Sequence, residues 1–365
     1  MIIKDVLIAN YDNVIDCADI EFDEFITKIT PKKGIAKYLL VPGFIDTHIH
    51  GFMGDDVMDS PEALKRIAHN LALRGVTSFM PTAMTASWDE LNRSLTHMNL
   101  QFNNGAKNIG IHIEGPFIGE AKKGAHKSEW LRKATKSDIE TLVKSSNNFL
   151  RKISFDPLMF DKKLVHELQK HNIQASIGHT IAGFEIAAEY FKSGVNCICH
   201  LWNAMTGFDS RNPGLVQAAV QYPVYSEIIA DLHHICERTL DQTLYMLDED
   251  HIMCISDAIR PAYGPDGKCY SGGVAIEKKG NIIYLEGTKT IAGSAICLHD
   301  AFLNLLIMKH SLKNVVKWTS YNAAVAYKLK KVAYISEGYY ADFVLLDCKN
   351  LSKIMTVYIN GKKIE

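Results

Sequence analysis

Apolar runs alternate with amphipathic segments along most of the chain, and this alternation predicts units of one strand followed by one helix. Eight apolar runs have the character of strands in a parallel sheet. We place them at Leu39–Asp46, Thr77–Pro81, Asn108–Ile113, Lys152–Asp156, Gln174–Gly178, Asn196–His200, Ser226–Ala230 and Ile252–Ser256. Eight strands with intervening helices predict an α/β fold of the (β/α)8 TIM barrel type.

Helical segments fit the gaps between these runs. One is expected at Pro61–Arg74, with Ser60 as its N-cap and Gly75 after its last residue. A second is expected at Gly183–Lys192, just before Gly194. These helix boundaries separate neighbouring apolar runs and so support counting the runs as individual strands.

The two ends of the chain have a different pattern. Residues 1–38 and 331–365 contain short stretches of period-two alternation, and neither stretch can bury a core alone. The simplest solution is that they pair with each other as a small β-sandwich. We therefore expect residues 1–41 together with 331–365 to form a small β-sandwich domain, and residues 42–330 to form the barrel domain.

Composition and charge narrow the class of protein. Hydrophobic residues make up 47% and charged residues 22% of the 365 residues, a globular mixture with enough apolar material for a large core. The 40 basic and 41 acidic residues leave a formal net charge of -1. This balance argues against nucleic acid and membrane surfaces as partners, and an anionic small molecule would need a local basic pocket.

The N-terminal segment lacks the basic and apolar regions of a secretory signal, and no apolar run is long enough to span a bilayer. The 8 cysteines form no CxxC pair, which is typical of reduced structural thiols. We expect a cytoplasmic protein.

Polar side chains gather where the predicted strands end. In a barrel of this kind the chemistry lies at the carboxyl ends of the strands. The strand-end residues that could bind a metal or carry a proton are Asp46, His48, His50, Glu114, His179, His200, Asp231, His233, His234 and Asp257.

Two sets of these residues have the chemistry of metal ligands. His48 and His50 are two positions apart, so an extended segment places both on one face. Glu114, His179 and His200 offer a second set of the same type. Imidazole and carboxylate ligands favour zinc, iron, nickel or manganese over calcium or magnesium. The residues would hold one divalent metal ion or two, with Glu114 able to bridge.

A single histidine is more often structural than a ligand, and most of the 15 histidines need no special role. The metal hypothesis rests on five ligand candidates all falling at predicted strand ends. Asp257 ends the last apolar run, and its alternative interpretation is a helix N-cap. Beside a metal, a general base is the better interpretation, because water activated there needs a proton acceptor.

At this point the residues match a known family. Over nearly its whole length the chain resembles the N-acetylglucosamine-6-phosphate deacetylases of the amidohydrolase superfamily. The motif at Pro42–Gly51, PGFIDTHIHG, is similar to the first-strand signature of the superfamily. The motif at His112–Phe117, HIEGPF, followed by KGAH at Lys123–His126, resembles the signature of the deacetylases, which is more specific. Further matches in the same order are Gly178–Thr180, His200–Met205 and Ser256–Ala258.

The resemblance implies roles for individual residues. Glu114, His179 and His200 would be the main metal ligands, and His48 and His50 would complete a second site. Asp257 would be the catalytic acid and base, and His126 would hydrogen-bond the developing oxyanion. The substrate contacts implied by the family are Ala125, Asn203, Ala204, Ile291, Ala292 and Gly293, with Arg211 and His234 holding the sugar phosphate. The family pattern also suggests a homodimer.

Three departures from the family pattern limit these inferences. Asp231-Leu232-His233-His234 leaves the register of the phosphate-binding histidine open. Ile259, Arg260 and Pro261 replace small residues and could alter the sugar pocket or add a cation near it. Asn322-Ala323-Ala324 replaces a turn that normally contains proline, a change we expect to be structural.

The implied reaction is hydrolysis of the acetamide of N-acetylglucosamine 6-phosphate, a small-molecule amino-sugar phosphate, to glucosamine 6-phosphate and acetate. One alternative is cyclic-amide hydrolysis, which commonly uses a carboxylated lysine on the fourth strand. The fourth strand, ending Ile153-Ser154-Phe155-Asp156, is interpreted as offering none, and Glu114 on the third strand takes the bridging place. A second alternative is a non-catalytic protein that keeps the amidohydrolase fold. The sequence contains neither a GxGxxG motif after a strand nor a P-loop.

Overall fold

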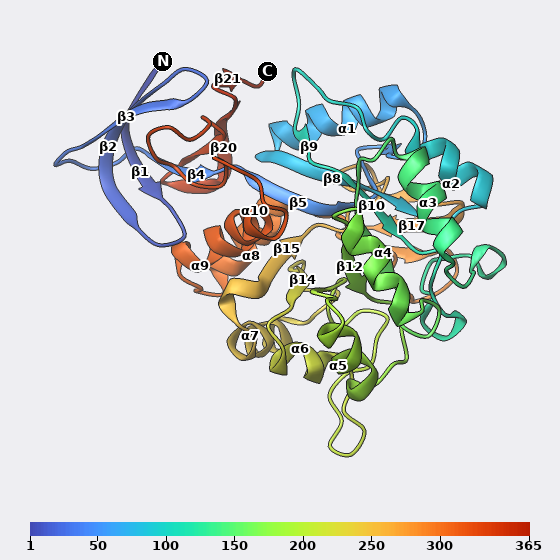
Figure 1. Cartoon of the computed structure of the whole chain (residues 1–365). Coiled ribbons are helices and arrows are strands. Elements are labelled where there is room, and N and C mark those ends of the chain that lie inside the picture. The colour runs from blue at the N-terminus through green and yellow to red at the C-terminus, as the bar shows by residue number, and fades with distance from the viewer.

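The computed structural model describes residues 1–365, and a ring of eight parallel strands lies at its centre (Figure 1). The α/β barrel predicted from the sequence is confirmed. Its strands, in order around the ring, are β5 (Phe44–Ile49), β8 (Val76–Met84), β10 (Ile111–Glu114), β11 (Leu150–Phe155), β12 (Gln174–Ile177), β13 (Cys197–Ile198), β14 (Tyr225–Ile229) and β15 (Ile252–Ile255). Short β9 (Lys107–Asn108) pairs with β8.

The ring is nearly closed where its first and last strands meet. The backbone N–H of Asp257 donates to the carbonyl of His48 at 2.9 Å, and the N–H of His50 donates to Ala258 at 2.8 Å. These bonds join the carboxyl end of β5 to the residues that follow β15. The closure therefore places residues about 200 positions apart in the chain side by side at the carboxyl rim.

The first predicted strand is two strands. The apolar run at Leu39–Asp46 is divided at Gly43 into β4 (Tyr38–Pro42), which belongs to another sheet, and β5. A Cβ atom on Gly43 would lie 2.1 Å from the Thr77 side chain, so only glycine allows the chain to pass β8 this closely. The sequence shows no boundary between the two strands, because both are buried and their residues form one continuous apolar run.

Helices cover the outside of the barrel (Figure 1). They are α1 (Pro61–Leu73), α2 (Trp88–Leu95), α3 (Lys136–Ser145), α4 (Val165–Lys170), α5 (Phe184–Lys192), α6 (Leu215–Gln221), α7 (Glu237–Met246), α8 (Leu298–Ile307), α9 (Leu312–Val316) and α10 (Asn322–Ala326). The N-cap prediction for Ser60 is confirmed, because its hydroxyl accepts from the N–H of Ala63 at 3.2 Å. None of the helices combines the length and apolar character that crossing a membrane requires.

The two ends of the chain pair with each other, as predicted. One seven-stranded sheet, called here the end sheet, has the order β21-β20-β19-β4-β1-β2-β3. Its other strands are β1 (Ile2–Ala9), β2 (Val14–Phe22), β3 (Ile26–Pro31), β19 (Phe343–Asp347), β20 (Asn350–Ile359) and β21 (Lys362–Lys363). The sheet encloses its own core, in which the ring of Phe22 meets that of Phe343 edge-on at 5.0 Å.

A small antiparallel sheet follows the last barrel strand and was not predicted. It consists of β16 (Gly267–Ser271), β17 (Val274–Lys279) and β18 (Ile282–Leu285), and it is called the cap below. Its inner face packs Ile276 and Ile283 against Ile259 and Ala292 beside the barrel mouth. Short β6 (Gly51–Phe52) and β7 (Asp55–Asp56) form a hairpin at the same rim.

Candidate active site

A pocket with a volume of about 380 Å³ lies at the carboxyl ends of the barrel strands. Most residues singled out in the sequence line it. These are His50, Glu114, Ala125, His126, His179, His200, Asn203, Ala204, His234, Asp257, Ile291, Ala292 and Gly293. Gly124 of the KGAH motif and Ile259, which we expected to alter the sugar pocket, also line it. The remaining wall comes from residues that the sequence analysis missed, namely Met84, Ala121, Lys122, Ser271, Val274, Ile276 and Thr290.

Three of the polar residues in this pocket have a backbone conformation that is unusual outside glycine. The φ angles of His179, His200 and Asp257 are 49°, 26° and 51°, and each residue lies two positions beyond the end of a barrel strand. Residues in the left-handed region are strained, and such strain concentrates at functional sites. The left-handed backbone turns the chain away from the strand direction at each of these residues, and the side chains of all three face the pocket.

His179, His200 and Glu114 form the first cluster, called site 1. Glu114 Oε1 lies 3.2 Å from His179 Nε2 and 2.9 Å from His200 Nε2, and the two ring nitrogens are 3.0 Å apart. A tetrahedral zinc ion with bonds near 2.0 Å requires its ligand atoms to be roughly 3.3 Å apart. The spacing in site 1 is close to that value.

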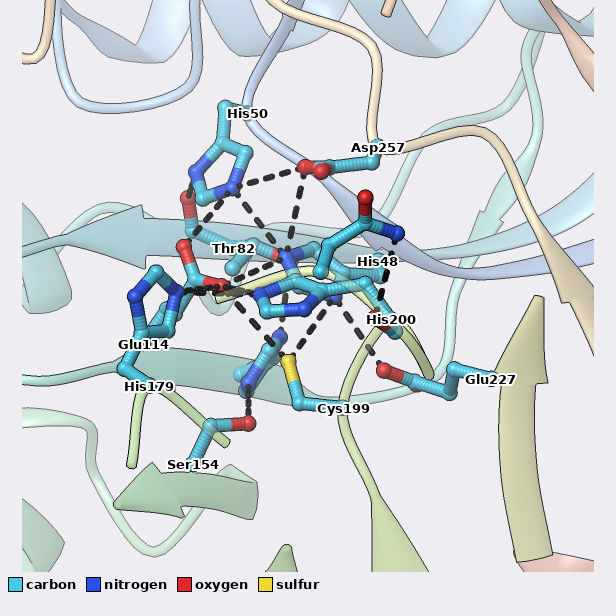
Figure 2. Close-up of polar contacts among 12 residues, drawn as sticks. His48, His50, Thr82, Glu114, Ser154, His179, Cys199, His200, Glu227 and Asp257 are labelled. Carbon is cyan, nitrogen blue, oxygen red and sulfur yellow. Dashed lines mark hydrogen bonds and ion pairs between the residues drawn. The ribbon is translucent and has the colours of Figure 1, made fainter. Parts of the chain in front are cut away.

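His48, His50 and Asp257 form the second cluster, called site 2 (Figure 2). The Nε2 atoms of the two histidines are 3.1 Å apart, and they lie 3.5 and 3.3 Å from Asp257 Oδ1. Glu114 stands between the sites, with Oε1 3.5 Å from His48 Nε2 and Oε2 3.3 Å from His50 Nε2. One carboxylate can therefore serve both clusters.

The tautomers of these histidines favour a cation at the centre. The Nδ1 atom of His50 faces the carbonyl of Thr82 at 3.0 Å, and that of His179 faces the carbonyl of Lys122 at 2.8 Å. A carbonyl only accepts hydrogen bonds, so both Nδ1 atoms are donors and the Nε2 lone pairs point inward. These lone pairs face the Glu114 carboxylate at 3.2 Å from His179 and 3.3 Å from His50, and such atoms repel unless a proton or a metal ion lies between them. The donor set fits a divalent metal ion.

The electrostatics of the cluster support the same conclusion. Burial disfavours a charged imidazole at His50, but Asp257 and Glu114 outweigh it and raise the pKa of His50 to about 10. Burial likewise opposes ionisation of Asp257, yet His48 and His50 lower its pKa to about 2. The cluster thus pairs ionised carboxylates with rings that take up positive charge.

His126 lies between site 1 and the cap. Its Nε2 is 3.4 Å from Glu114 Oε2, and its Nδ1 is 2.7 Å from the Thr85 hydroxyl. Burial lowers the pKa of His126 to about 4, so the ring is neutral near pH 7. Because the Glu114 carboxylate that Nε2 faces only accepts hydrogen bonds, the ring presents its Nε2–H to the pocket.

The two histidines after the seventh barrel strand lie in different cavities. His234 lines the pocket, and its Nδ1 is 2.7 Å from Asp231 Oδ2. His233 lines a separate cavity with Leu232. Arg211 does not line the pocket of its own chain, because it lies in the exposed connection between β13 and α6.

Comparison with known proteins agrees with this geometry. The sequence profile of the amidohydrolase family matches residues 39–364. The chain belongs to the amidohydrolase family. An N-acetylglucosamine-6-phosphate deacetylase from Lysinibacillus sphaericus is 31% identical over 86% of this chain and 83% of the relative. An N-acetylgalactosamine-6-phosphate deacetylase from Escherichia coli O157:H7 is 30% identical over 73% of this chain and 72% of the relative.

A solved structure supports the same relationship. The N-acetylglucosamine-6-phosphate deacetylase of Thermotoga maritima superposes with a TM-score of 0.90 at 28% identity, covering 100% of this chain and 99% of the other. The likeness extends over the barrel and the end sheet of this amidohydrolase.

Arg260 stays outside the pocket of this amidohydrolase, although its neighbour Ile259 lines it. The guanidinium donates to both Asp59 carboxylate oxygens at 2.7 Å and to the carbonyl of Tyr270 at 2.6 Å. It thereby ties the cap to the segment that follows β7. We expected that Arg260 could add a cation near the sugar, and the geometry gives it this bridging contact instead.

The fourth barrel strand does carry a lysine, which the sequence analysis overlooked. Lys152 lies on β11 with its side chain inside the barrel, where Nζ contacts Glu227 and donates to the carbonyl of Thr47 at 3.0 Å. The lysine is therefore engaged below the pocket and is not free to bridge metals. Charged residues within otherwise apolar strands were the signal that could have revealed both Lys152 and Glu227.

Proposed function

We propose that this amidohydrolase removes the acetyl group of N-acetyl-D-glucosamine 6-phosphate, giving D-glucosamine 6-phosphate and acetate, in amino-sugar catabolism. The observation that carries the proposal is that two histidine pairs, Glu114 and Asp257 converge at one end of the barrel. All of them except the fully buried His48 line the same pocket. The substrate class follows from the relatives, which are deacetylases of N-acetylglucosamine 6-phosphate and N-acetylgalactosamine 6-phosphate.

The residues divide into metal-holding and reacting groups. Site 1 would hold the main divalent ion through Glu114, His179 and His200, and site 2 would hold a second through His48 and His50. Zinc, iron, nickel and manganese suit these ligands, with one or two ions per subunit. A bound ion would supply Lewis acidity toward the amide carbonyl and toward water.

Asp257 acts as the proton carrier. Its ionised carboxylate takes a proton from the attacking water as the water oxygen bonds to the amide carbon. It then gives this proton to the sugar nitrogen as the carbon–nitrogen bond breaks, so acetate and the free amine result. His126 donates its Nε2–H to the carbonyl oxygen, where negative charge develops.

The rest of the pocket would bind the sugar and its phosphate. Ala125, Asn203, Ala204 and Ile291–Gly293 form the walls around the sugar. His234, fixed by Asp231, faces the same space and would hydrogen-bond the phosphate. Because Arg211 is remote from the pocket of its own chain, we propose that it reaches the phosphate of a second copy in a homodimer.

The replacement Asp257→Asn tests the mechanism. We expect turnover of N-acetylglucosamine 6-phosphate to fall by roughly 10²–10⁴-fold, because the amide cannot accept the proton from water. Metal content measured on the same sample should show that site 1 remains filled. The matched control is Asp156→Asn, since Asp156 is also a buried strand-end carboxylate but lies outside the pocket. Near-normal turnover of Asp257→Asn with retained metal would contradict the proposal.

Substrate panels separate the proposed activity from its rivals. N-acetylglucosamine 6-phosphate, N-acetylgalactosamine 6-phosphate and unphosphorylated N-acetylglucosamine should be compared with cyclic ureides. We expect hydrolysis of the acetylated sugar phosphates and none of the ureides. Efficient ureide hydrolysis would instead support the cyclic-amide alternative. A metal-free, inactive protein would support a non-catalytic role.

A further inference from the structure

A buried ion pair lies inside the barrel, beneath the pocket. Lys152 on β11 and Glu227 on β14 both have no exposed surface, and Nζ of the lysine contacts Glu227 Oε1. The same Oε1 accepts from the Thr47 hydroxyl at 3.2 Å. Neither residue lines the pocket, so neither can touch a substrate.

The second oxygen of Glu227 is directed at a proposed metal ligand. Glu227 Oε2 lies 3.2 Å from His48 Nδ1 (Figure 2). An ionised carboxylate only accepts, so His48 donates from Nδ1 and its Nε2 lone pair faces site 2. With Oε1 bound to Lys152 and Thr47, the carboxylate cannot turn away from the ring.

This arrangement differs from that of the other histidines in the two sites. His50 and His179 are held by backbone carbonyls, and His200 Nδ1 has no partner. Only His48 is held by a charged side chain. A carboxylate makes the opposite ring nitrogen a stronger donor to a metal than a carbonyl does.

A contribution to folding stability does not explain the buried Lys152–Glu227 pair. Removing two charges from water costs several kcal/mol per ion, and apolar replacements of a buried pair are often neutral or stabilising. The position of the pair under His48 gives it a functional reason. Lys152 provides the counter-charge that allows Glu227 to stay ionised without water.

We propose that Glu227, with Lys152 as its counter-ion, is a positioning residue that controls metal binding at site 2 through His48 and leaves site 1 unaffected. The inference rests on the proposed metal-dependent function. It assigns a role to two residues that touch neither the substrate nor the metal.

The test is a metal titration of the full-length protein after chelator treatment. Wild type, Glu227→Gln, the double variant Lys152→Met with Glu227→Gln, and Ser154→Ala are titrated with Co²⁺. Visible absorption follows each equivalent, and elemental analysis gives the bound amount. Ser154→Ala is the matched control, because Ser154 is buried in the same interior and bonds only His112.

We expect wild type and Ser154→Ala to bind two equivalents. In Glu227→Gln the first equivalent should bind as in wild type, and the second should bind about 10–100-fold more weakly. The double variant has no unpaired buried charge, so it should fold and show the same selective weakening. If Glu227→Gln alone fails to fold, the metal titration of the double variant tests the proposal.

Other results would overturn the inference. Unchanged binding of both equivalents by the variants would remove the positioning role, and equal weakening of both would indicate general damage. A wild type that binds one equivalent would also overturn it, while leaving site 1 and deacetylation intact. A wild type that binds no metal would contradict the proposed function itself.

Discussion

Five imidazole rings around the pocket are each held at one nitrogen by a partner behind it. The partners are Glu227 for His48, Thr82 for His50, Thr85 for His126, Lys122 for His179 and Asp231 for His234. Each bond fixes the orientation of a ring and decides which nitrogen faces the pocket. The chemistry of a single residue here therefore depends on a neighbour, which comes from a different strand or loop in every case except Asp231 and His234.

At the residue scale, His126 should affect the transition state more than substrate binding. Replacing it with alanine removes the only neutral imidazole donor proposed for the oxyanion. We expect kcat for N-acetylglucosamine 6-phosphate to fall by roughly 10²–10³-fold, with KM within a few-fold of wild type. Steady-state kinetics on metal-replete protein measure both. A large rise in KM with unchanged kcat would assign His126 to binding alone.

The phosphate contacts give a second residue-scale prediction. His234→Asn should raise KM for N-acetylglucosamine 6-phosphate by about 10-fold, because one hydrogen bond to a charged group is lost, and kcat/KM for the unphosphorylated sugar should stay unchanged. His233→Asn is the matched control, since His233 lines a different cavity. An equal loss on both substrates would show that His234 does not recognise the phosphate.

At the scale of elements, polar side chains fasten strand β16 of the cap to the barrel rim. Arg260 bonds both Asp59 and the β16 residue Tyr270, and the Ser271 hydroxyl donates to Asp56 at 2.9 Å. The cap supplies Ser271, Val274 and Ile276 to the pocket wall. Its position thus determines the shape of the pocket opposite the metal ligands.

Releasing this fastening should loosen the cap. We expect Arg260→Ala to speed amide hydrogen exchange in β16–β18 and to lower kcat/KM a few-fold, while exchange in the barrel strands stays slow. Mass-spectrometric exchange by segment is the measurement. Lys268→Ala is the control, because the Lys268–Glu286 pair is exposed on the cap and does not reach the rim. Equal exchange in wild type and Arg260→Ala would show that other contacts hold the cap.

At the scale of the whole molecule, the end sheet connects the first and last strands of the chain. β19 pairs with β4 from Phe343 opposite Pro42 to Asp347 opposite Tyr38, and β4 leads directly into β5. We interpret residues 1–41 with 331–365 as a small domain that has its own core. This domain anchors the strand that carries His48 and His50.

Phe343 is the residue whose loss should damage that core most clearly. It is fully buried between Phe22 and Tyr358. We expect Phe343→Ala to lower the free energy of unfolding of this part by roughly 3–5 kcal/mol, through lost burial and a cavity. Denaturant unfolding followed by tyrosine fluorescence measures the change. Ile2→Ala, at a largely exposed position of β1, should have little effect, and a comparable loss there would argue against a core-specific cause.

Most of the barrel fold could be predicted from the sequence. Buried parallel strands produce apolar runs, and Ser60 and Gly75 mark the helix between the first two barrel strands, so eight strands could be counted before any coordinate was known. The split at Gly43 and the cap were missed. Steric contact with Thr77 decides the split, and the cap strands are too polar and half-exposed to resemble core strands.

For the site, the sequence by itself determined which ligand types stand at which strand ends, because strand direction and the two-residue period are local properties. Only the tertiary structure decided the distances that unite His48, Glu114 and Asp257, since these depend on closing the ring between β5 and β15. The same holds for Lys152 and Glu227. Their strands are separated by two others in the sheet, and only the barrel's curvature brings the two charges together across its interior.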